Sequence, residues 1–323
     1  MRLHDDDASF SVKGGRYVPA RAGRSKRSRF DDDNTETSRY SLIDEELFEA
    51  RGHRRHLEAV DDTPDQGSRW STWDQSTPTE RGPKPYPDWL VTELAAVDTE
   101  LGILKTGKEA DVFLVERAVP GTDRSCLLAA KRYRSSKHRM FHRDAGYLEG
   151  RRVKESRMNR AMAGRTDFGR ELISGQWAAA EFSALCVLYE AGVSVPYPVQ
   201  IVGTEVLLQF LGDESAAAPR LAQLRRDTAD LDDLWRQLVD AMHTMAHAGF
   251  AHGDLSAYNL LVHNGRLVVI DLPQIVDVIA NPQGREFLTR DARNVATWFA
   301  SHGVHKADGD ELAEDLLRSA NLR

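Results

Sequence analysis

The sequence predicts an α+β fold with two lobes, the first built on a sheet and the second small and largely helical. Two observations support this prediction. Residues 101–131 hold three short stretches with strand-like apolar patterns, separated by turn signals. Residues 231–248 and 287–299 instead repeat apolar side chains at helical spacing. A chain of 323 residues with 41% hydrophobic side chains is long enough for one such domain and an additional tail.

Residues 1–82 differ in composition from the rest of the chain. Acidic runs alternate there with basic clusters, and few side chains are apolar, so we expect a mostly disordered charged tail. One helix is expected inside it, from Ser41 to about Leu57. Trp70 and Trp73 interrupt the polar stretch and are interpreted either as partner contacts or as part of the disordered tail.

The remaining sequence is expected to form two lobes of one domain. Residues 83–211 would make the N-terminal lobe, opening with a helix over residues 88–97, and residues 212–323 the smaller C-terminal lobe. The two cysteines, Cys126 and Cys186, are too few for a disulfide framework and fit a reducing compartment. No apolar run is long enough to span a bilayer, and the first residues lack a signal-peptide pattern. We therefore expect a cytoplasmic protein without a membrane contact.

A turn between the first two expected strands has the chemistry of a phosphate-binding loop. It comprises Thr106, Gly107, Lys108, Glu109 and Ala110. Its backbone N–H groups and the threonine hydroxyl can face phosphate oxygens. Gly102 to Lys108 also matches the opening of a Walker A loop, but that motif continues with Ser or Thr and a helix. Here Glu109 and a strand-like stretch follow, so the sequence favours a strand, a turn and a strand.

The third expected strand, residues 127–131, ends in Lys131. A lysine at this place in a kinase-type site holds the α- and β-phosphates of a nucleotide, and it requires a carboxylate that positions it. Glu181, within the helical apolar pattern of residues 176–190, is the candidate for that carboxylate. The alternative is an exposed lysine at a strand end and a glutamate on a solvated helix face.

The most informative motif is His252-Gly253-Asp254-Leu255-Ser256-Ala257-Tyr258-Asn259. In H-x-D-x-x-x-x-N, the Asp orients the attacking hydroxyl group or water and accepts its proton, and the Asn gives an oxygen to a divalent metal ion. Two short strands joined by a turn at residues 263–266 follow, and Asp271 at their end would link that ion to nucleotide phosphates. The alternative is a surface turn that happens to contain Asp and Asn. The spacing and the hairpin favour catalysis by Asp254, with Asn259 and Asp271 on the metal.

Together these segments resemble the RIO protein kinases, atypical members of the protein-kinase-like fold. The resemblance rests on residues 106–112, Lys131, residues 177–181, the motif 252–259 and Ile270-Asp271, and it extends over about residues 85 to 302. The long gap between Lys131 and Trp177 and the run Glu286-Phe287-Leu288-Thr289-Arg290-Asp291 resemble the first RIO subfamily, here in a bacterial form.

The resemblance implies a kinase-like fold whose reduced C-terminal lobe lacks an activation segment and peptide-docking helices. It implies the use of ATP and Mg²⁺, with Mn²⁺ as a substitute, and autophosphorylation on serine. In archaea and eukaryotes it implies a part in maturation of the small ribosomal subunit. Some members are thought to act mainly as ATPases, through a phosphorylated aspartate at the position matching Asp271. The adenine edge would be bound by main-chain groups of Gln209 and Leu211.

Several positions depart from the pattern of typical kinases or of the family. Gly253 replaces the Arg of H-R-D, which argues against control through a phosphorylated activation loop, and residues 272–323 are too few for such a segment with docking helices. Ser256 replaces the catalytic-loop Lys, as in RIO proteins, and indicates a slow turnover. Gln209 replaces a Glu without affecting a main-chain contact, and Pro273 has no N–H group near the metal.

Residues 132–170 are strongly basic. They hold twelve Arg or Lys and four Asp or Glu, a surplus of eight positive charges, in a chain with a net charge of −7. Aromatic side chains interrupt the basic ones, so the segment could bind RNA or ribosomal phosphates with a steep dependence on salt. The alternative is a flexible solvated insertion over the nucleotide site.

Three functions compete on this evidence. The first is a RIO-type serine/threonine kinase or ATPase with an unknown protein substrate. The second is a small-molecule kinase of the aminoglycoside phosphotransferase type, which shares H-G-D-x-x-x-x-N; the turn 106–112 and the short C-terminal region disfavour it. The third is a nucleotide-binding assembly factor whose catalysis is incidental.

Overall fold

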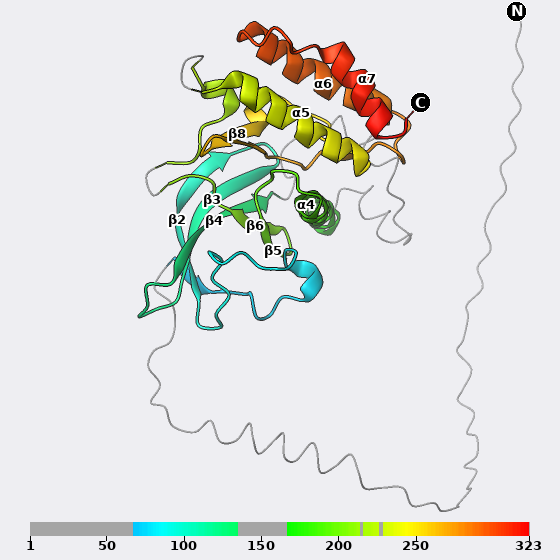
Figure 1. Cartoon of the computed structure of the whole chain (residues 1–323). Helices are drawn as coiled ribbons and strands as arrows, with labels where there is room; N and C mark the ends of the chain where they lie inside the picture. The colour runs from blue at the N-terminus through cyan, green and yellow to red at the C-terminus, as the bar shows by residue number, and fades with distance from the viewer. Residues whose placement is uncertain (1–66, 135–166, 214–215, 226–228, 323) are drawn as a thin grey trace, which may run out of the picture. The chain divides into compact units, whose positions relative to one another are not determined.

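The computed structural model describes residues 67–134, 167–213, 216–225 and 229–322 of the chain. The helix expected from Ser41 to Leu57 and most of the basic segment 132–170 lie outside these residues. The described part has an antiparallel sheet at one end and a group of helices at the other (Figure 1). This arrangement confirms the predicted α+β fold. Within the described residues, no helix has both the length and the apolar character needed to cross a membrane.

The sheet has six strands in the order β1-β2-β3-β4-β6-β5, and each pair of neighbours is antiparallel. Its strands are β1 (Ser68–Trp70), β2 (Val97–Thr106), β3 (Ala110–Ala118), β4 (Ser125–Tyr133), β5 (Pro198–Val202) and β6 (Glu205–Gln209). The three strands predicted within residues 101–131 are therefore present. Lys131 lies opposite Val112 on one side and Val206 on the other, so it projects from the middle of the sheet.

The segment before β2 corrects two predictions. Residues 67–82 are not a disordered tail: Ser68–Trp70 pairs with β2, and the short 3-10 helix η1 (Pro78–Glu80) follows. Trp73 is buried, and its ring lies edge-on to Tyr86 with centroids 5.1 Å apart. An apolar anchor of this size supplies burial that the polar composition of the segment did not predict.

The helix expected over residues 88–97 is also absent: the chain is irregular up to the start of β2 at Val97. Leu90, Val91 and Ala96 are buried against the sheet, whereas Leu94 is 77% exposed. A helix would have placed Leu90 and Leu94 on one face. Packing of consecutive side chains against the sheet has therefore overridden the helical pattern.

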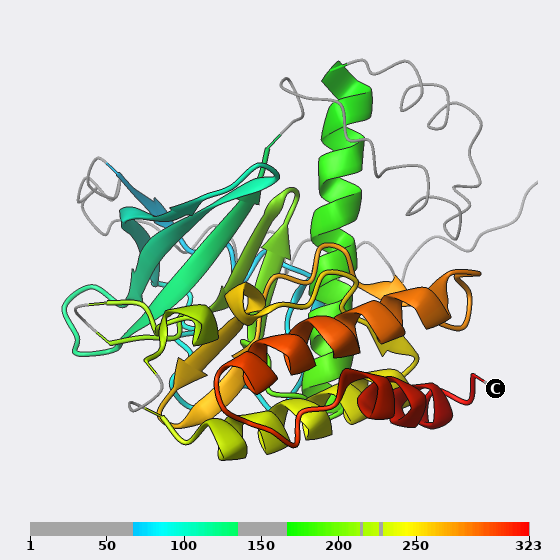
Figure 2. The ribbon, with the colours of Figure 1, turned by 90° about the horizontal axis from the view of Figure 1, so that it is seen from above.

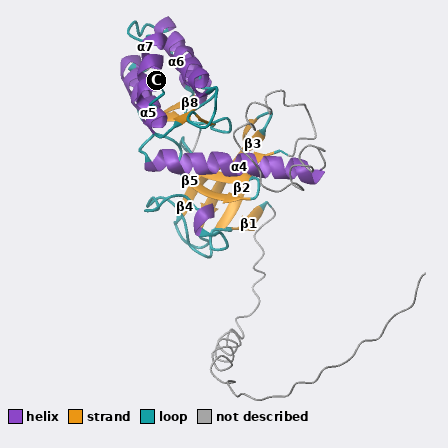
Figure 3. Cartoon of the chain, turned by 90° about the vertical axis from the view of Figure 1, so that its right-hand side faces the viewer, coloured by secondary structure: helices purple, strands orange, loops and turns teal. Residues whose placement is uncertain are grey.

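The long helix α4 (Asp167–Glu190) connects the two parts of the molecule. It stands beside the sheet and extends beyond it (Figure 2), and in another view it lies between the strands and the remaining helices (Figure 3). Ala178 and Phe182 pack with the sheet residue Val206, whereas Leu185 and Leu188 belong to the core of the helical part. The helix predicted over residues 176–190 is thus present and begins nine residues earlier, at Asp167.

The helical part contains three helices, two small two-stranded sheets and two 3-10 helices. Its helices are α5 (Leu231–His247), α6 (Gly284–Ser301) and α7 (Gly309–Ser319). Its strands are β7 (Phe250–Ala251) with β10 (Val276–Asp277), and β8 (Leu260–His263) with β9 (Arg266–Val269). The 3-10 helices are η2 (Leu221–Gln223) and η3 (Ala257–Asn259).

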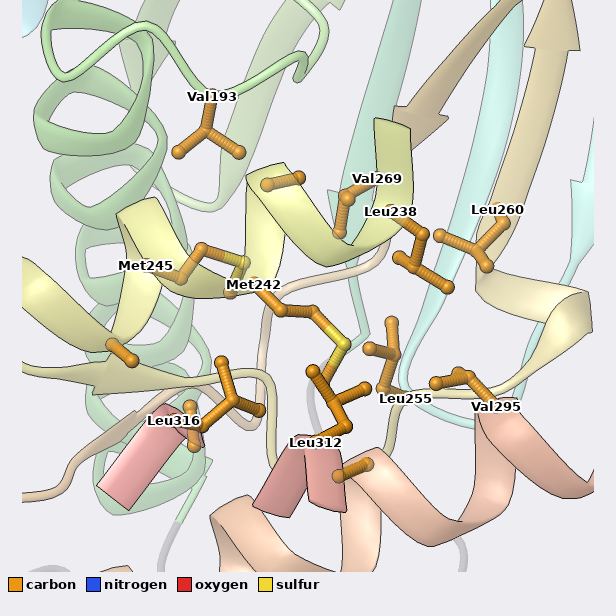
Figure 4. Packing of buried hydrophobic residues seen from close by; sticks show 14 of the residues in the cluster. Val193, Leu238, Met242, Met245, Leu255, Leu260, Val269, Val295, Leu312 and Leu316 are labelled. Atoms are coloured by element: carbon orange, nitrogen blue, oxygen red, sulfur yellow. The ribbon is translucent and has the colours of Figure 1, made fainter. Parts of the chain in front are cut away.

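One apolar core holds these elements together. Leu238 and Met242 of α5 meet Leu255 and the α6 residue Val295, and Leu316 of α7 closes the cluster (Figure 4). The apolar stripes predicted over residues 231–248 and 287–299 therefore face a common interior. The predicted hairpin at residues 263–266 is also present, and positive φ angles at Asn264 and Gly265 (51° and 73°) fit its two-residue turn.

Candidate active site

The predicted lysine–glutamate pair is formed between β4 and α4. Lys131 Nζ donates to Glu181 Oε1 at 2.6 Å, and both side chains are nearly buried. Tyr133 donates its hydroxyl hydrogen to the other oxygen of Glu181. Burial alone would lower the pKa of Lys131, but the carboxylates of Glu181 and Asp271 outweigh it and raise the pKa. Lys131 is therefore held as a cation in a fixed position.

Asp271 brings the two parts of the molecule into contact at this lysine. It follows β9, and its Oδ1 accepts from Lys131 Nζ at 2.9 Å, while Lys105 Nζ of β2 lies 3.3 Å from Oδ2. Burial would raise the pKa of Asp271, but the two ammonium groups outweigh it and hold the pKa far below its usual range. The next residue adds a second link, because the backbone N–H of Leu272 donates to Glu181 Oε1 at 3.0 Å.

The backbone of Asp271 lies in the left-handed region, with φ at 67°. Few non-glycine residues adopt this conformation, although Asp tolerates it better than most, and such strain is concentrated at functional sites. This backbone conformation turns the chain shortly after the end of β9 and directs the Asp271 carboxylate to the sheet.

Asp254 lies on the loop that leads into η3, and Asn259 is the last residue of η3, directly before β8. The Asn259 Nδ2 group donates to the backbone oxygen of Asp254 at 2.9 Å, which leaves the amide oxygen as an acceptor. The backbone N–H of Ile270 donates to the Asn259 carbonyl at 3.0 Å, so this loop is tied to the residue before Asp271. Asp254 is exposed.

His252 supports the same loop from inside. Its Nε2 lies 3.0 Å from the carbonyl oxygen of Ile270, which can only accept, so Nε2 carries the hydrogen. Nδ1 then accepts from the backbone N–H of Asp254 at 3.4 Å. The imidazole thus links the two segments that carry Asp254 and Asp271.

A group of α6 side chains beneath the loop was not assigned a role from the sequence. The buried carboxylate of Asp291 accepts the backbone N–H groups of Gly253 and Leu255, at 2.8 and 3.0 Å. Arg290 donates to the Gly253 carbonyl oxygen, and Asn294 Nδ2 lies 3.4 Å from the Leu255 carbonyl oxygen. The sequence did contain a signal for this role. Asp291 lies between Leu288 and Val295 on the apolar face of an amphipathic helix, where a carboxylate is expected only if it has hydrogen-bond partners.

Gly253 fits this arrangement because it has no side chain. Its φ is +85°, and a Cβ atom there would lie 2.3 Å from the carbonyl oxygen of Gln274. The position that carries Arg in typical kinases therefore has no room for a side chain in this protein.

The predicted phosphate-binding turn joins β2 and β3 near these groups. The Gly107 N–H donates to the Ala110 carbonyl at 3.0 Å, which closes the turn, and Thr106 and Lys108 are exposed. Burial and the nearby carboxylate of Asp271 raise the pKa of Glu109, and Lys131 opposes the shift; Glu181 and Asp254 contribute in the same direction as Asp271. The half-buried Glu109 is thus close enough to the charged groups of the site to interact with them electrostatically.

The predicted hinge lies at the end of β6. The Gln209 N–H donates to the Tyr197 carbonyl at 2.9 Å, and its side-chain Oε1 accepts the Tyr197 N–H at 3.2 Å. The Leu211 carbonyl accepts the Ala218 N–H at 2.8 Å, and no hydrogen bond of the Leu211 N–H is found among the described residues.

The residues around Asp271 fit a divalent cation. Asp271 pairs with Lys131 and Lys105, Glu181 pairs with Lys131, and the carboxyl groups of Glu109 and Asp254 lie near enough to interact electrostatically with this group. Within the described residues, no three His, Cys, Asp or Glu side chains form a metal site on their own. Mg²⁺ requires fewer protein ligands than that, because phosphate and water complete its shell, and one Asp and one Asn suffice.

This fold and this site define a class of protein. A buried lysine–glutamate pair between a strand and a helix faces an H-x-D-x-x-x-x-N loop and a following aspartate, an arrangement typical of protein-kinase-like phosphotransferases.

Comparison with known proteins places the chain in one family within that class. Residues 122–312, more than half of the chain, match the RIO domain. The chain is 36% identical over 218 residues to the RIO-type serine/threonine-protein kinase Rio1 of Haloferax volcanii, covering 68% of this chain and 69% of that protein. The chain belongs to the RIO family of serine/threonine-protein kinases.

Other relatives match over different lengths. The Rio1 protein of Thermoplasma acidophilum is 31% identical over 53% of this chain and 84% of its own length. Human serine/threonine-protein kinase RIO3 is 28% identical over 70% of this chain, which spans only 43% of the human protein. Among solved structures, the Rio2 kinase of Chaetomium thermophilum, in a complex described as ADP/Mg²⁺-phosphoaspartate, matches with a TM-score of 0.45 and 20% identity, over 69% of this chain and 67% of that one.

Proposed function

We propose that this chain is an ATP- and Mg²⁺-dependent serine/threonine protein kinase that phosphorylates itself, with ATP hydrolysis as a competing outcome. One observation supports this most directly. Lys131 from the sheet meets Asp271 from the helical part at 2.9 Å, and the segment before Asp271 is hydrogen-bonded to the loop of Asp254 and Asn259. The two parts therefore supply complementary halves of one phosphoryl-transfer site.

In this proposal each residue has a defined task. The Lys131 ammonium, positioned by Glu181, binds the α- and β-phosphates, and the turn at residues 106–109 covers the phosphate chain. Asp254 orients the serine hydroxyl or water and accepts its proton as the bond to phosphorus forms. The leaving diphosphate stays bound by Lys131. Because Ser256 stands where many kinases have Lys, the transferring group meets one charge fewer, and turnover is slow.

Asp271 and Asn259 are the proposed metal ligands, and Mn²⁺ is proposed to replace Mg²⁺ there. When bound, the cation neutralises charge on the phosphates. Gln209 and Leu211 would bind the adenine edge through main-chain groups. We further propose that residues 83–211, extended by β1 to residue 67, and residues 212–323 act as the two lobes that hold the nucleotide, and that the protein works in the cytosol, where the free thiols of Cys126 and Cys186 persist.

Labelled ATP tests the proposal. The protein alone is incubated with γ-labelled ATP and Mg²⁺, and wild type is compared with Asp254→Ala and Asp271→Ala. Phosphoserine that is lost in both variants supports the kinase, and free phosphate without labelled protein supports the ATPase.

Two results would contradict the proposal. Labelling only of an added aminoglycoside-type metabolite would favour a small-molecule kinase, and tight nucleotide binding without any turnover would favour an assembly factor. We also predict a role in maturation of the small ribosomal subunit, with contacts made through residues 132–170. Co-purification of the native protein with ribosomal particles tests this prediction.

A further inference from the structure

Lys105 is a second lysine at the site that the sequence motifs did not single out. It lies at the end of β2, one residue before the phosphate-binding turn, and its Nζ is 3.3 Å from Asp271 Oδ2. Lys131 occupies the other oxygen of the same carboxylate, at 2.9 Å. The two lysines differ in burial: the Lys131 side chain is 9% exposed and the Lys105 side chain 41% exposed.

We propose that Lys105 is a positioning residue that occupies the metal-binding oxygen of Asp271 and competes with the divalent cation for it. This inference rests on the proposed function, because it takes Asp271 as a metal ligand. Lys105 would keep Asp271 paired before a metal ion is bound and would have to leave for the ion to enter.

Lys105 and a metal ion would compete because each oxygen of the Asp271 carboxylate already has a lysine partner. Oδ1 is committed to Lys131, which is itself fixed by Glu181 at 2.6 Å and buried. Oδ2 is the oxygen that a divalent cation could bind without displacing Lys131. A divalent ion bound to it at about 2 Å would lie within a few ångströms of the Lys105 ammonium, and like charges at that distance repel strongly. The ion and Lys105 Nζ therefore compete for Oδ2.

The same geometry makes Lys105 the displaceable partner. A lysine on an exposed strand is held by a weak ion pair, because solvent screens it and its flexible stem loses entropy on pairing. β2 is exposed over its last six residues, Leu101–Thr106, and its pairing with β3 is irregular between Ile103 and Lys105. Lys131, by contrast, could leave Asp271 only by vacating a buried site.

Metal binding to the nucleotide-free protein tests the competition. Free Mn²⁺ is measured by electron paramagnetic resonance as protein is added, and Mg²⁺ is then titrated in as a competitor. In Lys105→Gln the dissociation constants of both ions should fall about two- to fivefold, the range expected for removing an exposed ion pair. Lys105→Arg, which keeps a cation beside Oδ2, should bind as wild type does, and Asp271→Asn should lose the site.

Lys108→Gln is the matched control, because it removes the same charge from an exposed position three residues further along the chain. If Lys108→Gln shifts metal affinity as much as Lys105→Gln, a general charge effect explains the result and the proposal is wrong. An unchanged dissociation constant in Lys105→Gln, with circular dichroism showing native folding, would also overturn it. Labelling by ATP in wild type tests the proposed function separately, so failure of one does not imply failure of the other.

Discussion

The two halves of the candidate site are built from different kinds of contact. On the helical side, the loop of Asp254 and Asn259 is fixed through its backbone: Asp291 accepts two of its N–H groups, and His252 links it to Ile270. On the sheet side, Lys131 is fixed by side-chain charges, those of Glu181 and Asp271. The turn that begins at Thr106 is largely exposed.

This difference indicates how each half works. Backbone hydrogen bonds on a packed core fix the position of the group that handles the proton, where an error of a fraction of an ångström is costly. Charges on long side chains can adapt as phosphates and a metal ion enter and leave. We therefore expect changes on the helical side to act on the rate of transfer, and changes on the sheet side to act on nucleotide binding.

The largest expected effect is on the helical side. Asp254→Asn keeps the size of the side chain but removes the proton acceptor, so the rate of serine labelling from γ-labelled ATP should fall about 10²- to 10⁴-fold. ADP affinity, measured by calorimetry, should change by less than about twofold, because Asp254 does not hold the phosphates. A large loss of ADP affinity would show that the two halves do not divide the work in this way.

The next effect is on the sheet side. Lys131→Met removes a charge-assisted contact worth about 1.5–3 kcal/mol, so ADP affinity should fall about ten- to a hundredfold. It also leaves Glu181 as a buried charge without its cation, which should lower the free energy of unfolding by about 3–5 kcal/mol. The double variant Lys131→Met, Glu181→Leu should regain most of that stability but none of the ADP affinity. If ADP affinity returned with stability, Lys131 would be structural only.

A smaller effect concerns the backbone support of the loop. Asp291→Asn replaces one acceptor oxygen by an NH₂ group that faces an N–H, so the free energy of unfolding in urea should fall by about 1–3 kcal/mol. The labelling rate should fall more than ATP affinity does. Asp310→Asn is the control, since Asp310 forms an exposed ion pair with Arg293 and should cost less than about 1 kcal/mol. Equal losses for the two variants would contradict a special role for Asp291.

The smallest effect is a dependence on pH at Glu109, whose pKa is raised by burial and by Asp271. A carboxyl group with a raised pKa destabilises the fold once the pH exceeds its unfolded value of about 4.3, because unfolding lets it ionise. The cost grows until the pH passes the folded pKa. Glu109→Gln should therefore gain in melting temperature relative to wild type as the pH rises from about 4 toward 7. A constant difference across this range would contradict the shift.

The sequence predicted which of these residues lie together better than it predicted the borders of the fold. The spacing of Asp254, Asn259 and Asp271 and the position of Lys131 follow from local motifs, because short-range geometry determines them. Asp291 and Lys105 were missed, since their roles depend on contacts across 36 and 166 residues, for which no local pattern exists.

The errors near the N-terminal border have the same cause. Residues 67–82 have a polar sequence without a clear structural pattern. In the structure, however, Trp73 packs against Tyr86, and Trp70 belongs to β1, which pairs with β2 and extends the sheet. Residues 88–97 have a helical pattern, yet Leu90 and Val91 are both buried against the sheet. In both places tertiary packing decided the structure, and composition could not reveal it.

Hydrogen exchange on addition of ADP and Mg²⁺ tests most directly whether both halves bind one nucleotide. A shared site should slow amide exchange in two distant sets of peptides at once: those covering residues 106–110 and 209–211, and those covering residues 254–259 and 271–272. Lys131→Met should weaken the protection in both sets together. Protection confined to one set, or none at concentrations that saturate binding, would contradict the shared site.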